Sequence, residues 1–455
     1  MDPRSVKTIA DAKKIVTERK LEHVKVGLFD LDGVLRGKYM ARDKFFSALD
    51  KGFGYCNVVL GWDVADNLYD RASATSWDSG FPDAQVRIVP ESCRAIPFEG
   101  DMLLFLVEFD QPWDRYCPRG TLRRVIEYGQ ALGLKASAAC EFEFFVFNET
   151  PDSVRAKGYR NLETITPGMF GYSTIRNSVH ADYYRELMQL GLDMDFPIEG
   201  LHTETGPGVI EAAIVHTEAL AAADRAALFK TYAKIHAQRR NWMATFMAKW
   251  SPNYPGQSGH THVSLTDAKG KGVFYDAKKP HNISDTMRHF IGGQQLLMPQ
   301  LLAMVASSVN SYTRLIPGFW APTQASWGIE NRTCALRAIP GSEKSQRVEY
   351  RIAAADINPY LAVAAALGSG LYGIKHKIEP TEPALGNAYE MKFPAKLALP
   401  RTLWDAAQNL KKSAAARELF GDAFVDHYAY TREWEEREGR RAITDWQLAR
   451  YFEII

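Results

Sequence analysis

The sequence has little cysteine, no excess of either charge and no long apolar run. Its 455 residues include five cysteines without CxxC spacing, so neither a disulfide framework nor a thiolate zinc site is expected. Lysine and arginine number 55 against 54 for aspartate and glutamate, which excludes the strong basic field typical of nucleic-acid-binding proteins. The composition therefore predicts small molecules and further copies of the chain as partners.

No stretch of the sequence reaches the roughly 18 apolar residues that a membrane-spanning helix requires. The N-terminal segment MDPRSVKTIADAKKIVTERK is charged and has a helical pattern, whereas a secretory signal has an apolar centre. We therefore predict a cytoplasmic protein without nucleic-acid or membrane partners.

The length of the chain predicts two domains, because single cores stop growing at roughly 250 to 300 residues. Residues 24–40 have the pattern of a strand, a turn and a second strand. A segment punctuated by proline and glycine follows Trp113, and then residues 121–133 form an amphipathic pattern typical of a helix. We place the boundary there, with an N-terminal domain over 1–113 and a C-terminal domain over 114–455.

Two further helices are predicted in the C-terminal domain. Residues 217–250 are rich in alanine and indicate one long helix. Asn358 followed by Pro359 is typical of a helix N-cap and first helical residue.

The block CEFEFF places carboxylates at a spacing that a metal site can use. Its alternation is typical of a strand, in which Glu141 and Glu143 lie on the same face. Two like charges side by side destabilise a strand unless a cation compensates them. Taken alone, the block has an alternative interpretation, in which the glutamates face solvent and the phenylalanines fill the core.

Three further blocks also have ordinary interpretations when each is taken alone. In HTETGPGVIE, Glu204 and Glu211 lie on either side of a glycine loop that permits close approach of a ligand. In GQSGHTHVSL, His260 and His262 share a strand face, where the alternative is a hydrogen-bonded surface pair. In RVEYR, Glu349 lies between two arginines, where the alternative is a surface salt-bridge cluster.

The combination of blocks favours a metal and nucleotide site. Many carboxylates with few imidazoles suit Mg²⁺ or Mn²⁺ better than zinc. Guanidinium groups nearby would hold the negative charge of a phosphoryl group during its transfer. The arginines in question are Arg314, Arg332, Arg337, Arg347 and Arg351.

These blocks resemble the glutamine synthetase family, and the likeness continues through SYTRLIPGFWAP, ENRTCALRAIP and NPYLA. The resemblance implies an α+β chain with an N-terminal β-grasp-like domain and a C-terminal catalytic domain built on a curved antiparallel sheet with flanking helices. It also implies ATP and two or three Mg²⁺ or Mn²⁺ ions as cofactors. The implied assembly is a homo-oligomer, a dodecamer of two hexameric rings with each active site between subunits.

The resemblance also implies a role for individual residues. The ligands of one metal would be Glu143, Glu204 and Glu211, and those of a second metal would be Glu141, His260 and Glu349. The ATP-binding residues would be His262, Ser264, Lys344, Arg347 and Arg337. The catalytic residues would be Arg332, Arg337 and Asp63, and the residues around glutamate would be Gly256, Arg314 and Arg351.

The resemblance implies phosphorylation of the glutamate γ-carboxylate by ATP and then attack by nitrogen, which is a carbon–nitrogen ligase reaction with ADP as product. The sequence departs from the family at the nitrogen donor. The family's flap glutamate after PGF or PGY is Trp320 here, which cannot accept a proton. The family's ammonium-binding motif FDGSS is matched only loosely by GWDVADN, in which Asp63 is the candidate.

An amine pocket lined by Trp62, Asp63, Trp320 and Trp327 would suit an organic amine better than a small hydrated cation. The alternative for each tryptophan is packing in the core or between subunits. The chain thus resembles the γ-glutamylamide synthetase branch, and we predict a hydrophobic alkyl or aryl monoamine as substrate. Polyamines, ethanolamine and ammonia are the alternative nitrogen donors.

Two rival interpretations come from other classes of protein. FDLDGVL imitates the opening motif of haloacid dehalogenase phosphatases, with Asp30 as nucleophile and Asp32 as acid/base, but the continuation RGKYM does not fit. A non-catalytic assembly protein of the glutamine synthetase type is the other rival, against which the six matched metal ligands argue. Tyr389 lies where some bacterial members carry an adenylylated tyrosine, but its flanks differ, so we predict a surface-loop aromatic.

Overall fold

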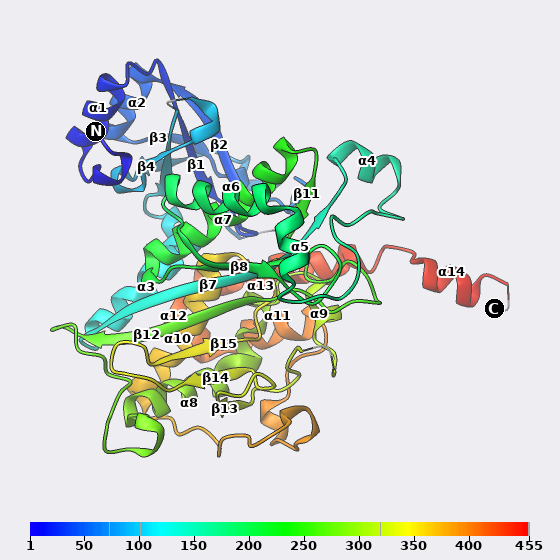
Figure 1. Cartoon of the computed structure of the whole chain (residues 1–455). Helices are drawn as coiled ribbons and strands as arrows, with labels where there is room; N and C mark the ends of the chain where they lie inside the picture. The colour runs from blue at the N-terminus through cyan, green and yellow to red at the C-terminus, as the bar shows by residue number, and fades with distance from the viewer. Residues whose placement is uncertain (72, 101, 319, 454–455) are drawn as a thin grey trace.

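Two β-sheets organise the chain, as the computed structural model in Figure 1 shows. The structure describes residues 1–71, 73–100, 102–318 and 320–453. The first sheet lies in the blue N-terminal part of the figure, and the second runs through the centre of the molecule.

The first sheet has the strand order β2-β1-β6-β4-β3, with β5 paired to β6. Its strands are β1 (His23–Phe29), β2 (Leu35–Ala41), β3 (Phe53–Cys56), β4 (Asp83–Ile88), β5 (Arg94–Ala95) and β6 (Leu103–Phe109). Strands β1 and β6 are parallel neighbours, and helices α1 (Ile9–Glu18) and α2 (Arg42–Lys51) bury apolar side chains in the core of this sheet. This arrangement agrees with the predicted β-grasp-like N-terminal part.

The second sheet has the order β13-β14-β15-β12-β7-β9-β8, with β10 and β11 also paired to β7. Its strands are β7 (Leu134–Phe147), β8 (Ile198–Thr203), β9 (Val209–Ile214), β10 (Thr217–Glu218), β11 (Met243–Thr245), β12 (Gly259–Asp267), β13 (Trp327–Ile329), β14 (Leu336–Ile339) and β15 (Arg347–Tyr350). The sheet is antiparallel as predicted except at one edge, where β13 pairs with β14 in parallel.

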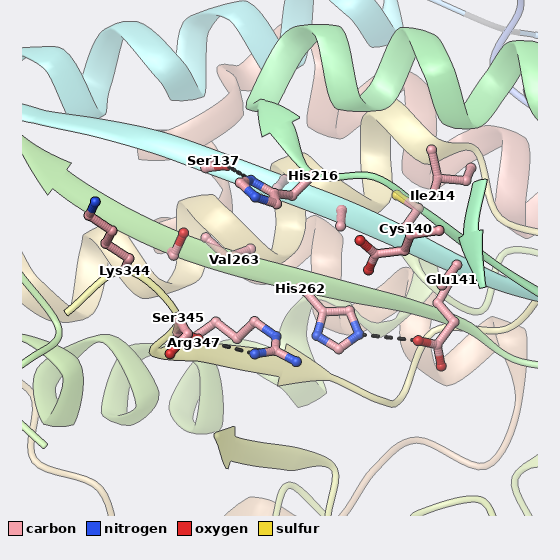
Figure 2. A pocket seen from close by; sticks show the side chains of 15 residues that line it. Ser137, Cys140, Glu141, Ile214, His216, His262, Val263, Lys344, Ser345 and Arg347 are labelled. Atoms are coloured by element: carbon pink, nitrogen blue, oxygen red, sulfur yellow. Dashed lines mark hydrogen bonds and ion pairs between the residues drawn. The ribbon is translucent and has the colours of Figure 1, made fainter. Parts of the chain in front are cut away.

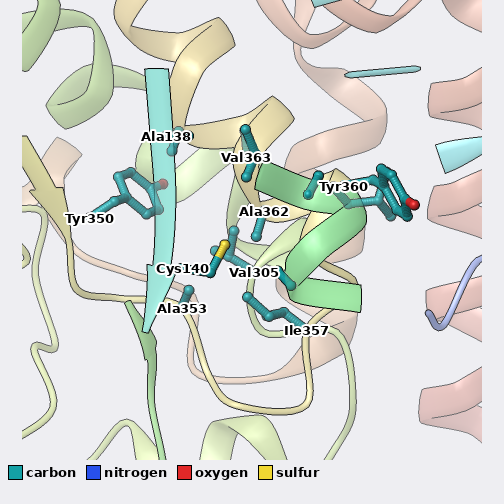
Figure 3. Close-up of a cluster of buried hydrophobic side chains, with 14 of the residues drawn as sticks. Ala138, Cys140, Val305, Tyr350, Ala353, Ile357, Tyr360, Ala362 and Val363 are labelled. Carbon is teal, nitrogen blue, oxygen red and sulfur yellow. The ribbon is translucent and has the colours of Figure 1, made fainter. Parts of the chain in front are cut away.

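Helices pack against the second sheet around α10 (Pro359–His376), which is buried along most of its length. Figure 3 shows Tyr360, Ala362 and Val363 of this helix in the cluster of buried hydrophobic side chains that also contains Cys140 of β7. The helices after the first two are α3 (Pro118–Ala131), α4 (Pro151–Ala156), α5 (Thr174–Val179), α6 (Ala181–Asp193), α7 (Ala219–Arg239), α8 (Asp285–Leu301), α9 (Ser311–Arg314), α10 (Pro359–His376), α11 (Leu403–Lys412), α12 (Ala414–Phe420), α13 (Asp422–Gly439) and α14 (Asp445–Tyr451). The described helices include none that is both long and apolar enough to cross a membrane.

The alternation in β7 fixes which face of the sheet carries chemistry. Phe142 and Phe144 are fully buried and pack against Phe229 of α7. Burial of each ring stabilises the fold by roughly 2 kcal/mol relative to exposure. Glu141 and Glu143 consequently lie on the opposite face, as the period of two requires.

The structure confirms one predicted helix start and shortens another helix. The Asn358 side chain accepts a hydrogen bond from the Tyr360 amide and caps α10, as predicted. The helix predicted over 217–250 ends at Arg239, because Asn241 adopts a left-handed φ of 59° and the chain then returns to pair β11 with β7. The domain boundary at residue 113 stays a prediction.

Candidate active site

Strand register brings carboxylates and imidazoles together on the face opposite the phenylalanine core. Glu141 of β7 stands opposite His260 of β12, and the His260 Nδ1–H donates to Glu141 at 3.2 Å. Glu143 of β7 stands opposite Glu211 of β9. Three strands therefore deliver four of the six predicted metal ligands to one surface.

Glu349 of β15 is the most buried carboxylate among the six predicted metal ligands. It stands opposite His262 of β12 on one side and Arg337 of β14 on the other. The Arg337 Nη1 lies 3.1 Å from Oε2 of Glu349, the Arg351 guanidinium contacts its Oε1, and the His260 Nδ1 lies 3.4 Å from Oε1. Burial alone raises the pKa of Glu349, but His260 and Arg351 together lower the pKa to about 2, so the carboxylate is ionised at neutral pH.

Two groups of three side chains have the compactness of a metal site. In each group one ligand atom per residue lies within 4.8 Å of the others. The groups are Glu141, His262 and Glu349, and His202, Glu204 and Glu211. The first group contains His262 in place of the predicted His260, and the second contains His202 in place of the predicted Glu143. His260 and Glu143 line the same cavity as these two groups.

The electrostatics of these carboxylates favour a cation. Burial raises the pKa of Glu211, and the nearby Glu141 and Glu143 charges raise it further, to about 10. Carboxylates crowded in this way repel one another unless a positive charge lies among them. A donor set rich in carboxylate oxygen is the set that Mg²⁺ and Mn²⁺ prefer.

A cavity of about 710 Å³ contains most of the predicted site. Its lining includes all six predicted metal ligands, the two predicted catalytic arginines, the three predicted glutamate-binding residues and Trp320. The non-acidic members of that group are His260, Arg332, Arg337, Gly256, Arg314, Arg351 and Trp320.

Arg314 and Gly256 fit closely against each other in this cavity. Arg314 is buried, donates from Nη1 to the Ile352 carbonyl at 3.0 Å, and has its pKa lowered to about 10 by burial. A Cβ on Gly256 would lie 2.7 Å from both the Ala248 carbonyl oxygen and Cγ of Arg314. Glycine is therefore needed here to let the buried guanidinium keep its position.

A second cavity of about 290 Å³ adjoins the first along β7 and β12 (Figure 2). Four of the predicted nucleotide-binding residues line it, namely His262, Ser264, Lys344 and Arg347. His262 and Arg347 line both cavities, so a molecule in the second cavity would reach the carboxylates of the first.

Two exposed aromatic side chains line the larger cavity. Trp320 is 60% exposed, and Tyr172 is 71% exposed and stacks on His202 with ring centroids 4.2 Å apart. Both have φ of 56°, a left-handed conformation that is uncommon for such bulky residues and clusters at functional sites. Tyr172 lies in a loop without any sequence signal, whereas His202 shares a strand face with Glu204 by the same period that revealed Glu141 and Glu143.

Three residues of the predicted amine pocket lie away from this cavity. Trp327 is buried in the main core, and its indole N–H donates to the Thr381 carbonyl at 2.7 Å, so its place in the pocket is corrected to packing. The Asp63 carboxylate is buried and accepts from the Ala65 and Asn67 amides at 2.8 Å. Trp62 lies in the same N-terminal part of the chain, with Cζ of Arg36 over its ring, 4.7 Å from the ring centroid.

The geometry around Asp30 does not favour the phosphatase interpretation. The buried Asp30 carboxylate accepts from the Asp32 and Val34 amides at 3.0 and 2.9 Å and from Arg36 Nε at 2.8 Å. Asp32 forms an ion pair of 2.9 Å with the buried Arg432 of α13. Both aspartates therefore hold a turn against neighbouring elements.

Tyr389 is not the exposed aromatic that the sequence predicted. It is half-buried in a short 3-10 helix, Ala388–Glu390, and burial raises the pKa of its hydroxyl. That hydroxyl is enclosed and finds no hydrogen-bond partner among the described residues.

Known proteins resemble the chain over nearly its whole length. A family model described as the catalytic domain of glutamine synthetase matches residues 115–451. The type-1 glutamine synthetase 2 of Dictyostelium discoideum is 42% identical over 443 residues, covering 96% of this chain and 84% of that protein. A glutamate–isopropylamine ligase from Pseudomonas sp is 36% identical over 463 residues, covering 100% of both chains. The solved structure titled "Apo GmaS without ligand" superimposes with a TM-score of 0.84 and 25% identity, covering 97% of this chain and 99% of that chain.

Proposed function

Because this chain belongs to the glutamine synthetase family, and is therefore a carbon–nitrogen ligase, we propose that it joins the γ-carboxylate of glutamate to a primary organic amine. The proposed amine is a hydrophobic alkyl or aryl monoamine. The relative named glutamate–isopropylamine ligase, which matches this chain from end to end, supports an organic nitrogen donor.

The observation that carries the proposal is the position of Trp320. Its indole lines the cavity that holds the carboxylates, at the point of the sequence where ammonia-using members of the family place a glutamate. Tyr172 adds a second exposed aromatic surface to the same cavity. Apolar walls favour the neutral, nucleophilic form of an amine over its ammonium form, because burial penalises charge.

The proposed reaction has two steps. A γ-carboxylate oxygen of glutamate attacks the γ-phosphorus of ATP, the bond to ADP breaks, and γ-glutamyl phosphate forms. The amine nitrogen then attacks the acyl carbon, loses a proton, and inorganic phosphate leaves. Phosphorylation is needed because a free carboxylate has no good leaving group.

The arginines of the cavity are assigned to the negative charges of this sequence. Arg332 and Arg337 would hold the transferring phosphoryl group, and Arg314 and Arg351 would hold glutamate. The Nε of Arg351 is buried without a hydrogen-bond partner among the described residues, so a donor is available for a bound carboxylate.

The family's cofactors are ATP and divalent metal ions, and the donor set fits such ions. The two compact groups around Glu349 and Glu211 would hold them. Bound Mg²⁺ or Mn²⁺ would neutralise charge on the phosphoryl oxygens. The protein's own part is to keep Glu349 ionised through Arg337, Arg351 and His260.

We further propose a homo-oligomer, a dodecamer of two hexameric rings. In it the N-terminal part of one subunit, with Trp62 and Asp63, would close the cavity of its neighbour. The position of both residues away from the cavity of their own chain is consistent with this assembly.

A plain glutamine synthetase is the second candidate, because the Dictyostelium discoideum relative carries that name at 42% identity. An amine panel separates the two candidates. ADP release is measured with glutamate, ATP and Mg²⁺ or Mn²⁺, and with ammonia, alkylamines, aromatic amines, ethanolamine or diamines as nitrogen donor. The proposal expects the hydrophobic monoamines to give the highest kcat/KM.

A further inference from the structure

One buried histidine of α13 ties together both ends of a loop in the N-terminal part of the chain. The His427 Nε2–H donates to the Leu60 carbonyl at 2.8 Å, and the His427 Nδ1 accepts from the Ala74 amide at 3.2 Å. Leu60 directly precedes the segment 61–71, called the 61–71 loop below, and Ala74 lies three positions after its last residue. Because each ring nitrogen has a partner, a single neutral tautomer satisfies both ends of the loop.

The same helix also holds the returning, C-terminal part of the 61–71 loop. The Tyr69 ring packs edge-on against Trp434, with centroids 5.2 Å apart. Asp70 accepts from Arg437 Nη2 at 3.1 Å and from the Tyr430 hydroxyl. Helix α13 therefore contacts this loop at its two ends and along its return.

A second anchor lies on strand β2. Arg36 reaches Asp66 at 2.6 Å and covers the Trp62 ring. The loop is thus held between the N-terminal sheet and the C-terminal helix. The tip of the loop is exposed, since Val64 is 63% accessible to solvent. The Asp63 carboxylate accepts hydrogen bonds from the loop's own Ala65 and Asn67 amides.

We propose that His427 is a positioning residue for the amine half of the reaction. By closing the base of the 61–71 loop it fixes how Val64 and its neighbours meet the cavity of an adjacent subunit. The inference rests on the proposed function, in which this loop completes the amine site of a neighbour.

This role differs from general support of the fold. A loop whose ends are untied gains mobility while the strands that bear the carboxylates keep their register. Loss of His427 therefore weakens the use of the amine and leaves binding of ATP and glutamate intact. A merely structural residue would affect all three substrates alike.

The test compares His427→Phe with Tyr428→Phe in the full-length protein. The first variant keeps an aromatic ring and loses both hydrogen bonds to the loop. The control loses one buried hydrogen bond of the same helix, from the Tyr428 hydroxyl to the Ala303 carbonyl at 3.1 Å, outside the loop. His427→Gln, which keeps a donor for Leu60, serves as a milder variant if His427→Phe does not fold.

Two readouts are taken for each variant. One is steady-state ADP release with isopropylamine as the probe amine, together with KM for ATP and for glutamate. The other is hydrogen exchange of the backbone amides of the 61–71 loop. We expect His427→Phe to lower kcat/KM for isopropylamine at least about tenfold, to change the other two KM values less than about twofold, and to speed exchange in the loop. His427→Gln should give intermediate values, and Tyr428→Phe should match the wild type.

Equal losses for all three substrates, or equal behaviour of His427→Phe and Tyr428→Phe, would overturn the inference. Faster exchange in the loop with unchanged amine kinetics would overturn it as well, since the loop would then have no part in the amine site. Failure of the proposed function shows separately, in a wild type that prefers ammonia to isopropylamine. The variants are then compared with ammonia as the nitrogen donor, and the same outcomes decide.

Discussion

Glu143 and Glu211 stand directly opposite each other on the antiparallel strands β7 and β9. Cross-strand neighbours of like charge destabilise a sheet, and burial together with the nearby carboxylates raises the pKa of Glu211 to about 10, so the pair takes up a proton unless a cation binds there. The strain is concentrated where Glu141 and Glu204 add further negative charge to the same cavity. An arrangement of this kind persists when a cation compensates it, which makes the carboxylates a functional rather than a stabilising feature.

We predict first that removal of a single carboxylate from the cavity lowers turnover. Glu143→Ala or Glu349→Ala should lower kcat by about 1,000-fold or more, because each takes several kcal/mol of charge stabilisation from phosphoryl transfer. The folded state should persist, as judged by circular dichroism. Initial rates of ADP release over a range of Mg²⁺ and Mn²⁺ concentrations check the effect, and Glu127→Ala on the exposed side of α3 is the matched control. Full activity in either variant, or turnover after exhaustive chelation, contradicts the assignment.

The second prediction concerns the close fit of Gly256. Gly256→Ala forces a methyl group against the Ala248 carbonyl and the Arg314 side chain, so the guanidinium must shift. KM for glutamate should rise about tenfold or more, equivalent to at least about 1.4 kcal/mol of binding, with KM for ATP nearly unchanged. Gly200→Ala, where an added Cβ meets only the Ala213 Cβ at 3.8 Å, should behave as wild type. An unchanged KM for glutamate in Gly256→Ala would separate Arg314 from glutamate binding.

The third prediction is a pH dependence of stability that His427 creates. Burial lowers the pKa of His427 from its ordinary 6.5 to about 4, so below pH 6.5 the unfolded chain binds a proton that the folded chain does not. The stabilisation is complete above pH 6.5 and is lost as the pH falls toward 4, by about 2 kcal/mol between pH 7.5 and pH 5. Urea unfolding at these two pH values should show this loss in the wild type in excess of that in His427→Gln. Identical pH dependence in both proteins would show that the imidazole titrates normally.

The fourth prediction exchanges the aromatic wall for a carboxylate. Trp320→Glu places a negative charge at the cavity, where it stabilises ammonium and penalises an apolar amine by about 0.8 kcal/mol for each CH₂ that loses its burial. The ratio of kcat/KM for ammonia to that for isopropylamine should rise at least about tenfold. Trp320→Phe, which keeps an apolar ring, is the matched control and should retain the wild-type order. An unchanged ratio in Trp320→Glu would place the amine elsewhere in the cavity.

Much of the site was predictable because it follows from strand periodicity. The period of two in CEFEFF indicates a buried phenylalanine face and a glutamate face, and the structure has both. The same rule applied to HTE would have added His202, whose side chain shares the face of Glu204. The pairing of Glu143 with Glu211 is different, since register between strands distant in sequence depends on the whole sheet.

The remaining features depended on tertiary contacts that the sequence does not encode locally. Trp327 has the composition of a pocket residue, yet its indole finds the Thr381 carbonyl in the core. Asp63 looks like a free carboxylate in the sequence, but the turn folds the amides of Ala65 and Asn67 onto it. The alanine-rich pattern predicted a helix that continues to residue 250, but α7 ends at Arg239 because Asn241 adopts a left-handed conformation.

The cytoplasmic location, the dodecamer and the individual ligand roles stay predictions. Of these, the dodecamer has the simplest check, because sedimentation velocity measures the mass of the active species. A fully active monomer would contradict a site completed by the 61–71 loop of a neighbour.

The proposed function is tested most directly by kcat/KM of the wild-type protein for ammonia and for isopropylamine, measured side by side as ADP release at saturating glutamate, ATP and Mg²⁺. We predict that kcat/KM for isopropylamine exceeds that for ammonia by at least about tenfold, because Trp320 and Tyr172 offer apolar contact to the alkyl group and no charge to ammonium. A higher kcat/KM for ammonia than for isopropylamine and every other organic amine tested would contradict it and leave a plain glutamine synthetase with an aromatic flap.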